Sequence, residues 1–138
     1  SLKRILDESR KKEPLLCVID EVLRGTNTIE RIAASSQILN SLRGNWILPF
    51  AATHDIELSY ILDEIYTNYH FEEEVREQEV VFNYLLKPGR ATTRNAIRLL
   101  DMLGYDQELV KNAGNAAAEF ERTGIWAKIS CAERKEQV

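Results

Sequence analysis

The sequence predicts an α/β protein in which two parallel core strands are followed by a β-hairpin and C-terminal helices. Two short apolar runs, 15–19 and 46–52, are separated by a helical pattern and end in polar residues, which is typical of a parallel sheet. Two segments rich in Tyr, Val and Phe, 64–75 and 79–86, favour a hairpin. The 138 residues are 44% hydrophobic and 29% charged, which suits one domain or a piece of one.

A helix, a strand and a second helix are expected first. Residues 2–12 are rich in good helix formers, and Pro14 ends that helix because it cannot continue one. The run 15–19 is apolar throughout, which predicts a strand buried on both faces. A turn follows, and Thr28 is the expected cap of a helix over 29–43, whose apolar residues repeat at helical spacing.

The remaining elements follow the second apolar run. That run is expected to be another buried strand, and a short helix is expected around 56–62. After the hairpin, Thr92 or Thr93 can cap a helix that reaches Gly104. A last helix is expected from Asp106 to about Gly124. The last residues, about 12 of them, are polar and are expected to form a frayed tail.

Charge and cysteine content exclude several classes of protein. The net charge of −4 leaves no broad basic surface for nucleic acid. Cys17 and Cys131 do not make a disulfide framework, and an apolar run around Cys17 predicts a buried thiol. The apolar runs are far shorter than a membrane span. We therefore expect a cytoplasmic protein without a membrane partner.

The sharpest chemical feature is a pair of adjacent acids at the end of the first strand. Asp20 and Glu21 follow the run 15–19 directly, and ligands of open α/β sheets bind at the carboxyl ends of the strands. Asp20 could hold Mg²⁺ on the phosphates of a nucleotide, and Glu21 could act as a general base on the attacking water. Alternatively, both acids could simply end the strand in a solvated loop, and this feature alone does not decide.

A second strand end carries a histidine. Thr53 and His54 follow the run 46–52, so they are expected to face the same crevice as the two acids. His54 could donate a hydrogen bond to a γ-phosphate or orient a water. A single histidine after a strand is more often structural, but two strand ends with Asp-Glu and Thr-His together favour a catalytic site.

Two segments resemble those of a known family of ATPases. Residues 15–28, which read LLCVIDEVLRGTNT, resemble the Walker B strand and D-loop of MutS-family DNA mismatch-repair proteins, which belong to the ABC class of P-loop NTPases. Residues 51–58, which read AATHDIEL, are similar to the switch segment of that family, and 80–113 resemble its closing hairpin and helices. The resemblance covers roughly residues 1–120 in the right order. It implies a partial, three-layer P-loop NTPase fold.

The resemblance implies a role for each matching residue of the two strand ends. Asp20 would be the Walker B acid that holds Mg²⁺, directly or through water. Glu21 would be the catalytic base. His54 would be the switch histidine that senses the γ-phosphate. The substrate would be ATP with Mg²⁺.

The D-loop implies a second subunit. In the family this loop packs across a dimer interface near the nucleotide of the partner, and here it consists of Gly25, Thr26 and Asn27. A homodimer through the ATPase domain is therefore implied, and DNA would bind to other domains of the parent protein. Asn27 stands where mismatch-repair members usually have Ser, and Val22-Leu23 replaces a more usual Ile-Gly.

The phosphate-binding half of such a site is missing from the sequence. No G-x-x-x-x-G-K-[ST] motif occurs, and no Gly is followed by Lys. We therefore expect residues 1–138 to be the C-terminal part of a MutS-type ATPase domain that, by itself, binds ATP poorly and hydrolyses it negligibly.

Two other functions stay open. One is a different ABC-class ATPase, such as an SMC-like or transporter subunit, although the hairpin and helices after His54 argue against it. The other is a non-catalytic dimerisation or interaction module that keeps the fold without turnover. A P-loop lysine and a signature serine upstream of Ser1 would favour the ATPase.

Overall fold

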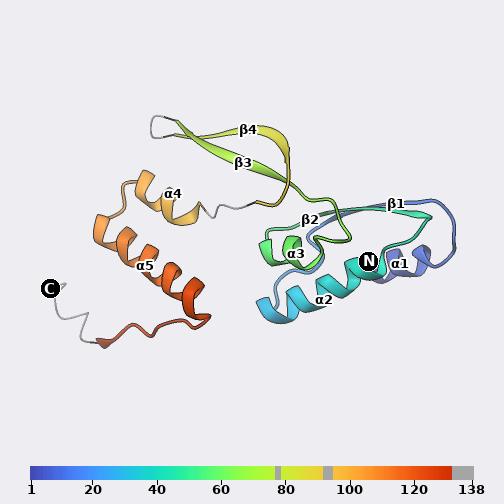
Figure 1. The fold of residues 1–138 in the computed structure, drawn as a ribbon, viewed down its shortest axis with the longest axis horizontal. Helices are drawn as coiled ribbons and strands as arrows, with labels where there is room; N and C mark the ends of the chain where they lie inside the picture. Colours follow the sequence, from blue (N-terminus) through green and yellow to red (C-terminus); the bar gives the residue numbers. More distant parts are fainter. Residues whose placement is uncertain (77–78, 92–94, 132–138) are drawn as a thin grey trace. The chain divides into compact units, whose positions relative to one another are not determined.

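The computed structural model describes residues 1–76, 79–91 and 95–131. The chain divides into two compact units. The first comprises Ser1–Glu72 and Tyr84–Ala91, and the second comprises Glu73–Asn83 and Thr92–Val138. Figure 1 shows the mixed helices and strands of both units along the chain. The predicted α/β class is thus confirmed.

The first unit carries the two strands that the apolar runs predict. Its elements, in chain order, are α1 (Leu2–Ser9), β1 (Leu15–Asp20), α2 (Thr28–Ser41), β2 (Ile47–Ala52) and α3 (Ile56–Ile61). β1 and β2 pair in parallel, with Leu15 opposite Ile47 at one end and Asp20 opposite Ala52 at the other. The residues that follow the two strands therefore leave the sheet at the same edge, as the sequence predicts.

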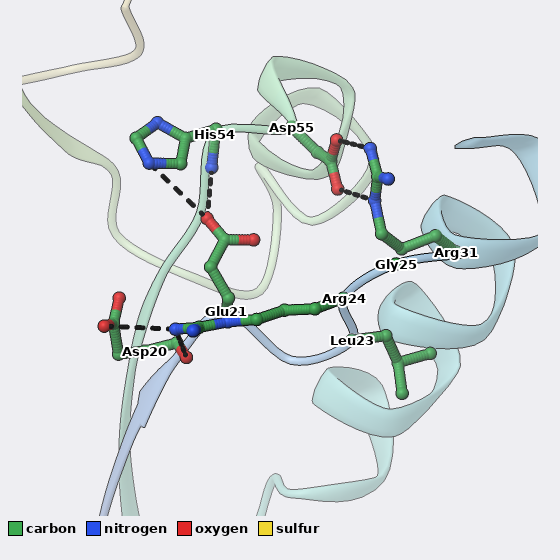
Figure 2. Close-up of a pocket in the computed structure, with 8 residues that line it drawn as sticks. All are labelled: Asp20, Glu21, Leu23, Arg24, Gly25, Arg31, His54 and Asp55. Carbon is green, nitrogen blue, oxygen red and sulfur yellow. Dashed lines mark hydrogen bonds and ion pairs between the residues drawn. The ribbon is translucent and has the colours of Figure 1, made fainter. Parts of the chain in front are cut away.

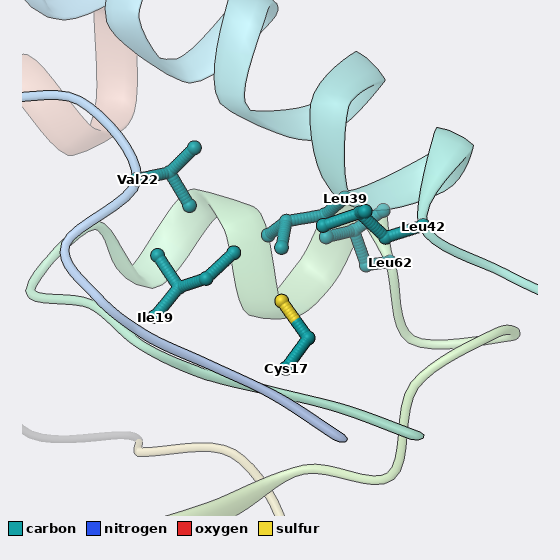
Figure 3. Packing of buried hydrophobic residues seen from close by; sticks show 6 residues of the cluster. All are labelled: Cys17, Ile19, Val22, Leu39, Leu42 and Leu62. Atoms are coloured by element: carbon teal, nitrogen blue, oxygen red, sulfur yellow. The ribbon is translucent and has the colours of Figure 1, made fainter. Parts of the chain in front are cut away.

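The core of the first unit lies on one face of this sheet. Cys17 and Ile19 of β1 point to it, and their exposed fractions are 3% and 8%. α2 contributes Leu39 and its C-cap Leu42, and Leu42 is fully buried. Figure 3 shows these side chains meeting in one cluster with Val22 and Leu62. The predicted buried thiol of Cys17 is confirmed, and burial raises its pKa.

The opposite face of the same sheet is exposed within this chain. The apolar side chains on it are 56–71% exposed: Leu16, Val18, Leu48 and Phe50. The prediction that the strands are buried on both faces is therefore wrong for the residues described. An unbroken apolar run predicts two faces that favour burial, but it does not supply the segment that covers the second face.

The start of α2 differs from the expectation by one residue. Asn27, and not Thr28, is the N-cap, because its Oδ1 accepts hydrogen bonds from the backbone N–H of Ile29 (2.9 Å) and of Glu30 (3.3 Å). Thr28 is the first residue of the helix. Asn and Thr both cap helices well, so the sequence alone did not separate them.

α1 is shorter than the predicted 2–12. It ends at Ser9 with Arg10 as its C-cap, and the left-handed backbone of Lys12 (φ 55°) shows that the helical conformation does not extend to the predicted end.

The predicted hairpin is present with shifted bounds. β3 (Tyr69–Arg76) and β4 (Glu79–Pro88) form a separate two-stranded sheet. The predicted strand residues before Tyr69 instead form turns after α3: the N–H groups of Ile65 and Tyr66 both donate to the carbonyl of Leu62. The hydroxyl of Tyr66 donates to the carbonyl of Leu39 on α2 at 2.7 Å, which holds this segment on the first unit.

The second unit contains two helices that pack on each other, α4 (Ala96–Met102) and α5 (Gln107–Thr123). Asp106 caps α5, and Gly124 ends it in a left-handed conformation (φ 72°), as expected. The predicted caps Thr92 and Thr93 lie outside the described residues, and Asn95 occupies the N-cap position of α4. Of the predicted frayed tail, 132–138 also lie outside them. Among the residues described, no helix is both long and apolar enough to cross a membrane.

Candidate functional site

An open depression lies at the carboxyl ends of β1 and β2. Its volume is about 490 Å³. Figure 2 shows the eight residues that line it. They come from the end of β1, the loop after it, the first turn of α2 and the loop after β2: Asp20, Glu21, Leu23, Arg24, Gly25, Arg31, His54 and Asp55. The parallel pairing of the two strands brings these segments together, because both loops start at the same edge.

Glu21 and His54 are joined directly across this edge. The Oε1 atom of Glu21 accepts a hydrogen bond from the backbone N–H of His54 at 2.8 Å. The same oxygen lies 3.9 Å from Nε2 of the His54 ring. The Glu21 side chain is 16% exposed, whereas that of His54 is 97% exposed. The carboxylate is therefore held in place, and Figure 2 shows the exposed His54 ring on the same side as the Glu21 carboxylate.

The backbone of Glu21 has an unusual conformation. Its φ is 60°, in the left-handed region that costs a non-glycine residue about 1–2 kcal/mol. The backbone N–H of Glu21 still donates to the carbonyl of Ala52 at 2.9 Å, so the chain turns sharply just after its last bond to β2. Strain of this kind gathers at functional sites, where the surrounding contacts keep a side chain in a required place.

Asp20 is more open to solvent and faces a cation. Its side chain is 82% exposed, and Nη2 of Arg24 lies 3.4 Å from Oδ2 and 3.2 Å from the Asp20 carbonyl. Within the described residues, no three His, Cys, Asp or Glu side chains gather into a set that could hold a metal ion. A magnesium ion on nucleotide phosphates needs only one or two protein carboxylates, because phosphates and waters complete its shell. The exposed carboxylate of Asp20 fits that requirement.

A bidentate ion pair lies on the other side of the depression. Arg31 of α2 donates from Nε to Oδ2 of Asp55 at 2.9 Å and from Nη2 to Oδ1 at 2.6 Å. Both side chains are largely buried, with 22% and 12% exposed. The hydrogen bond from Arg31 lowers the pKa of Asp55, and the bond to Asp55 raises the pKa of Arg31. Both groups are therefore charged at neutral pH.

The three predicted D-loop residues differ in their surroundings. Gly25 lines the depression with a left-handed backbone (φ 69°), a conformation that a residue without Cβ adopts at little cost. Thr26 and Asn27 do not line it. The carbonyl of Thr26 accepts a long hydrogen bond (3.5 Å) from Nη1 of Arg31, while the Asn27 side chain caps α2.

Four of the predicted site residues thus meet at one place: Asp20, Glu21, Gly25 and His54. Arg31 and Asp55 line the same depression, although neither was predicted from the sequence. One sequence signal points to Arg31. A cation near the N-terminus of a helix is unfavourable with the helix dipole, so Arg31 is poorly placed there unless an anion faces it.

The arrangement can support hydrolysis of a phosphate ester or anhydride. A fixed carboxylate (Glu21) can accept a proton from a water, and an exposed imidazole (His54) can donate a hydrogen bond to an oxyanion. An exposed acid (Asp20) can help bind a divalent cation. The described residues form no glycine-rich loop that could hold the phosphates themselves.

Comparisons with known proteins point to one family. The family model for MutS domain V matches residues 1–121. The chain is 32% identical over 123 residues to the DNA mismatch repair protein MutS of Aquifex pyrophilus, covering 87% of this chain and 14% of that protein. It is 30% identical over 112 residues to MutS of Roseiflexus sp. (strain RS-1), covering 78% and 10%. The chain therefore spans only about a tenth to a seventh of the length of these relatives.

Proposed function

Because the chain belongs to the MutS family and matches its domain V, we propose that it forms the hydrolysis half of the ATPase domain of a DNA mismatch-repair protein. The observation that carries this proposal is the hydrogen bond between Glu21 and the backbone of His54 at the shared edge of two parallel strands. Asp20 lies beside it at the end of the same edge. These are the positions at which the sequence resembles the Walker B and switch segments.

In the proposed reaction, water attacks the γ-phosphate of ATP. Glu21 accepts the proton of that water, and its fixed position reduces the reorganisation needed in the transition state. His54 donates a hydrogen bond to the γ-phosphate as negative charge spreads over its oxygens. Mg²⁺ would be held with the help of Asp20 and would supply charge neutralisation on the phosphates. Asp20 must first leave Arg24, and its exposure makes this exchange easy.

The remaining parts of such a site would come from elsewhere. We propose that residues 1–138 are the C-terminal part of a P-loop NTPase domain of the ABC class. The P-loop strand and its lysine would precede this part in a longer protein. The exposed apolar face of β1 and β2 suits a parallel sheet whose second face is covered by helices of the longer protein. By itself the chain would bind ATP weakly and hydrolyse it negligibly.

The proposal extends to the partners of the longer protein. Gly25, Thr26 and Asn27 would pack near the nucleotide of a second subunit and help complete its site. DNA would bind to other domains, because a net charge of −4 argues against a broad basic surface on this chain. ATP turnover would then change the conformation of the dimer on DNA.

The proposed function is tested by a Glu21→Gln substitution in that longer protein. We expect kcat for ATP to fall by about 100-fold or more, since a general base contributes about 10²–10⁴ to a rate. ATP should still bind, because the neutral amide removes the base without removing the cation site at Asp20. Steady-state turnover and equilibrium binding of a labelled ATP measure the two effects.

A matched control is Glu13→Gln, which changes an exposed glutamate outside the depression and should leave turnover unchanged. Unchanged turnover in Glu21→Gln would remove Glu21 from the role of base. If the unsubstituted protein itself showed no turnover, the second candidate, a non-catalytic interaction module, would take its place.

A further inference from the structure

The proposed reaction assigns no role to the ion pair between Arg31 and Asp55. It joins the first turn of α2 to the residue that follows His54. The two residues are 24 positions apart in the sequence, so only the fold brings them together. Their carboxylate and guanidinium make two parallel hydrogen bonds, a geometry that fixes orientation as well as distance.

We propose that Arg31 and Asp55 are positioning residues that hold the loop after β2 against the loop after β1, so that Glu21 and His54 keep the geometry required for hydrolysis. This inference rests on the proposed ATPase function. It assigns to the pair an action through His54 and Glu21, and not a contact with the nucleotide.

The contacts form a closed ring around the depression. The Glu21 carboxylate binds the N–H of His54, and Asp55 is the next residue along the chain. Asp55 binds Arg31, and Arg31 also donates to the carbonyl of Thr26, in the loop that starts at Glu21. Two cross-links therefore hold the loop after β2, one from Glu21 to His54 and one from Arg31 to Asp55. Without the pair, this loop would keep the contacts of Glu21 with His54 but would lose its link to α2 and to Thr26.

The hydrogen bonds of Arg31 argue against a direct role in binding phosphate. Nε and Nη2 both donate to Asp55, and Nη1 donates to Thr26. The adjacent carboxylate also neutralises the positive charge that would attract a phosphate. An arginine used in this way is oriented toward the protein and not toward a ligand.

Local helix preferences do not explain why an arginine occupies position 31. It lies in the first turn of α2, four residues after the N-cap Asn27, where the helix dipole disfavours a cation. Asp55 compensates for that cost from a distant loop. Arg31 also contacts Thr26. Movement of the loop 25–27 would therefore be transmitted through the Arg31 side chain to Asp55 and to the adjacent His54. A second subunit packed on this loop could thus influence the neighbouring hydrolytic residues.

The test uses the longer protein with three variants: Arg31→Gln, Asp55→Asn and the double variant. Each single substitution should lower kcat for ATP by about 10- to 100-fold, because small displacements of catalytic groups cost rates of that size. KM should stay within about threefold, since neither side chain is assigned to bind the nucleotide. The double variant should be no slower than the slower single one, because both single changes break the same interaction.

Hydrogen–deuterium exchange followed by mass spectrometry supplies a readout that needs no turnover. Peptides covering 52–56 should take up deuterium faster in all three variants, because the loop that presents the N–H of His54 to Glu21 is less restrained and this hydrogen bond opens more often. Tyr66→Phe is the matched control. It removes a hydrogen bond to Leu39 within the same unit but touches neither loop, so it should change neither kcat nor this exchange.

Three results would overturn the proposal. The first is a raised KM at unchanged kcat in Arg31→Gln, which would make Arg31 a nucleotide ligand. The second is a double variant whose loss equals the product of the two single losses. The third is unchanged exchange over 52–56. If the unsubstituted protein has no ATPase activity, the proposed function fails, and the exchange experiment still decides whether the pair holds the loops.

Discussion

The two units of the chain are stabilised in different ways. In the first unit, six residues with exposed fractions of 0–9% form a shared core between β1, α2 and the segment after α3. In the second unit, neither α4 nor α5, both fully described, contains a buried residue. α5 is stabilised locally, by its cap Asp106, by the ion pair of Arg122 with Glu119, and by the stacking of Trp126 on Phe120.

This contrast between the two units explains where the candidate site obtains its rigidity. Glu21 and His54 follow strands whose inner face is packed into a core, so small displacements of the loops are resisted by the whole first unit. The second unit has stabilising contacts of short range, which set helix ends but add little cooperativity. The geometry of the candidate site therefore depends on the core of the first unit.

The chain offers a separate optical probe for each unit. Trp46 lies in the first unit just before β2, and Trp126 lies in the second after α5. They are the two tryptophans of the sequence. Variants with a single tryptophan, Trp126→Phe or Trp46→Phe, therefore report the unfolding of one unit each by fluorescence.

The largest expected effect comes from the fully buried Leu42. Leu42→Ala should lower the free energy of unfolding of the first unit by about 3 kcal/mol, because it removes apolar contacts and leaves a cavity. Urea unfolding followed through Trp46 measures this. The matched change in the second unit is Leu109→Ala on α5, where the side chain is 46% exposed, and it should cost less than about 1 kcal/mol. Equal costs at both positions would contradict the comparison.

A smaller effect is expected from the two helix caps. Asn27→Ala removes two hydrogen bonds to the start of α2, and Asp106→Ala removes one to the start of α5. Each should cost about 1 kcal/mol locally. Asn27→Ala should lower the urea midpoint of unfolding measured by Trp46 fluorescence, since α2 is part of the core. For Asp106→Ala we expect reduced helicity by circular dichroism with an unchanged Trp46 midpoint, and a shifted midpoint would show that the units unfold together.

The smallest expected effect is a pH dependence at the base of the hairpin. His70 Nε2 lies 2.9 Å from Glu72 Oε1, and Nδ1 lies 2.9 Å from the carbonyl of Gly89. Both partners only accept, so both nitrogens donate when the ring is protonated. The hydrogen bond to Glu72, then that to Gly89, raises the pKa of His70 above its usual 6.5, while Lys87 opposes this through its charge.

The sign of that dependence follows from the raised pKa. The contribution of His70 to stability is fully present below pH 6.5 and is lost as the pH rises through the higher pKa of the folded state. The midpoint seen by Trp46 should therefore fall over this range. In His70→Gln, the decrease of the unfolding midpoint that His70 causes should disappear. An identical pH profile in both proteins would show that the contacts of His70 with Glu72 and Gly89 do not contribute to stability.

Local sequence patterns were enough to locate most of the elements. The apolar runs predicted β1 and β2, and Gly124 and Asp106 predicted the ends of α5. These predictions were correct because strand and cap preferences depend mainly on neighbouring residues. The residues Asp20, Glu21 and His54 were located by the same means, because parallel strands deliver their carboxyl-end residues to one edge. The roles of Thr26 and Asn27 at a subunit interface stay predictions.

How those residues are held depends on the tertiary fold. The hydrogen bond of Glu21 to the backbone of His54 and the pairing of Arg31 with Asp55 each join residues more than 20 positions apart. The exposure of the face of β1 and β2 that lies opposite the core likewise became known only from the fold. Residue type and local spacing were enough to identify the groups that could take part in the chemistry. Their orientation required the fold, because contacts distant in sequence are set by how the core packs.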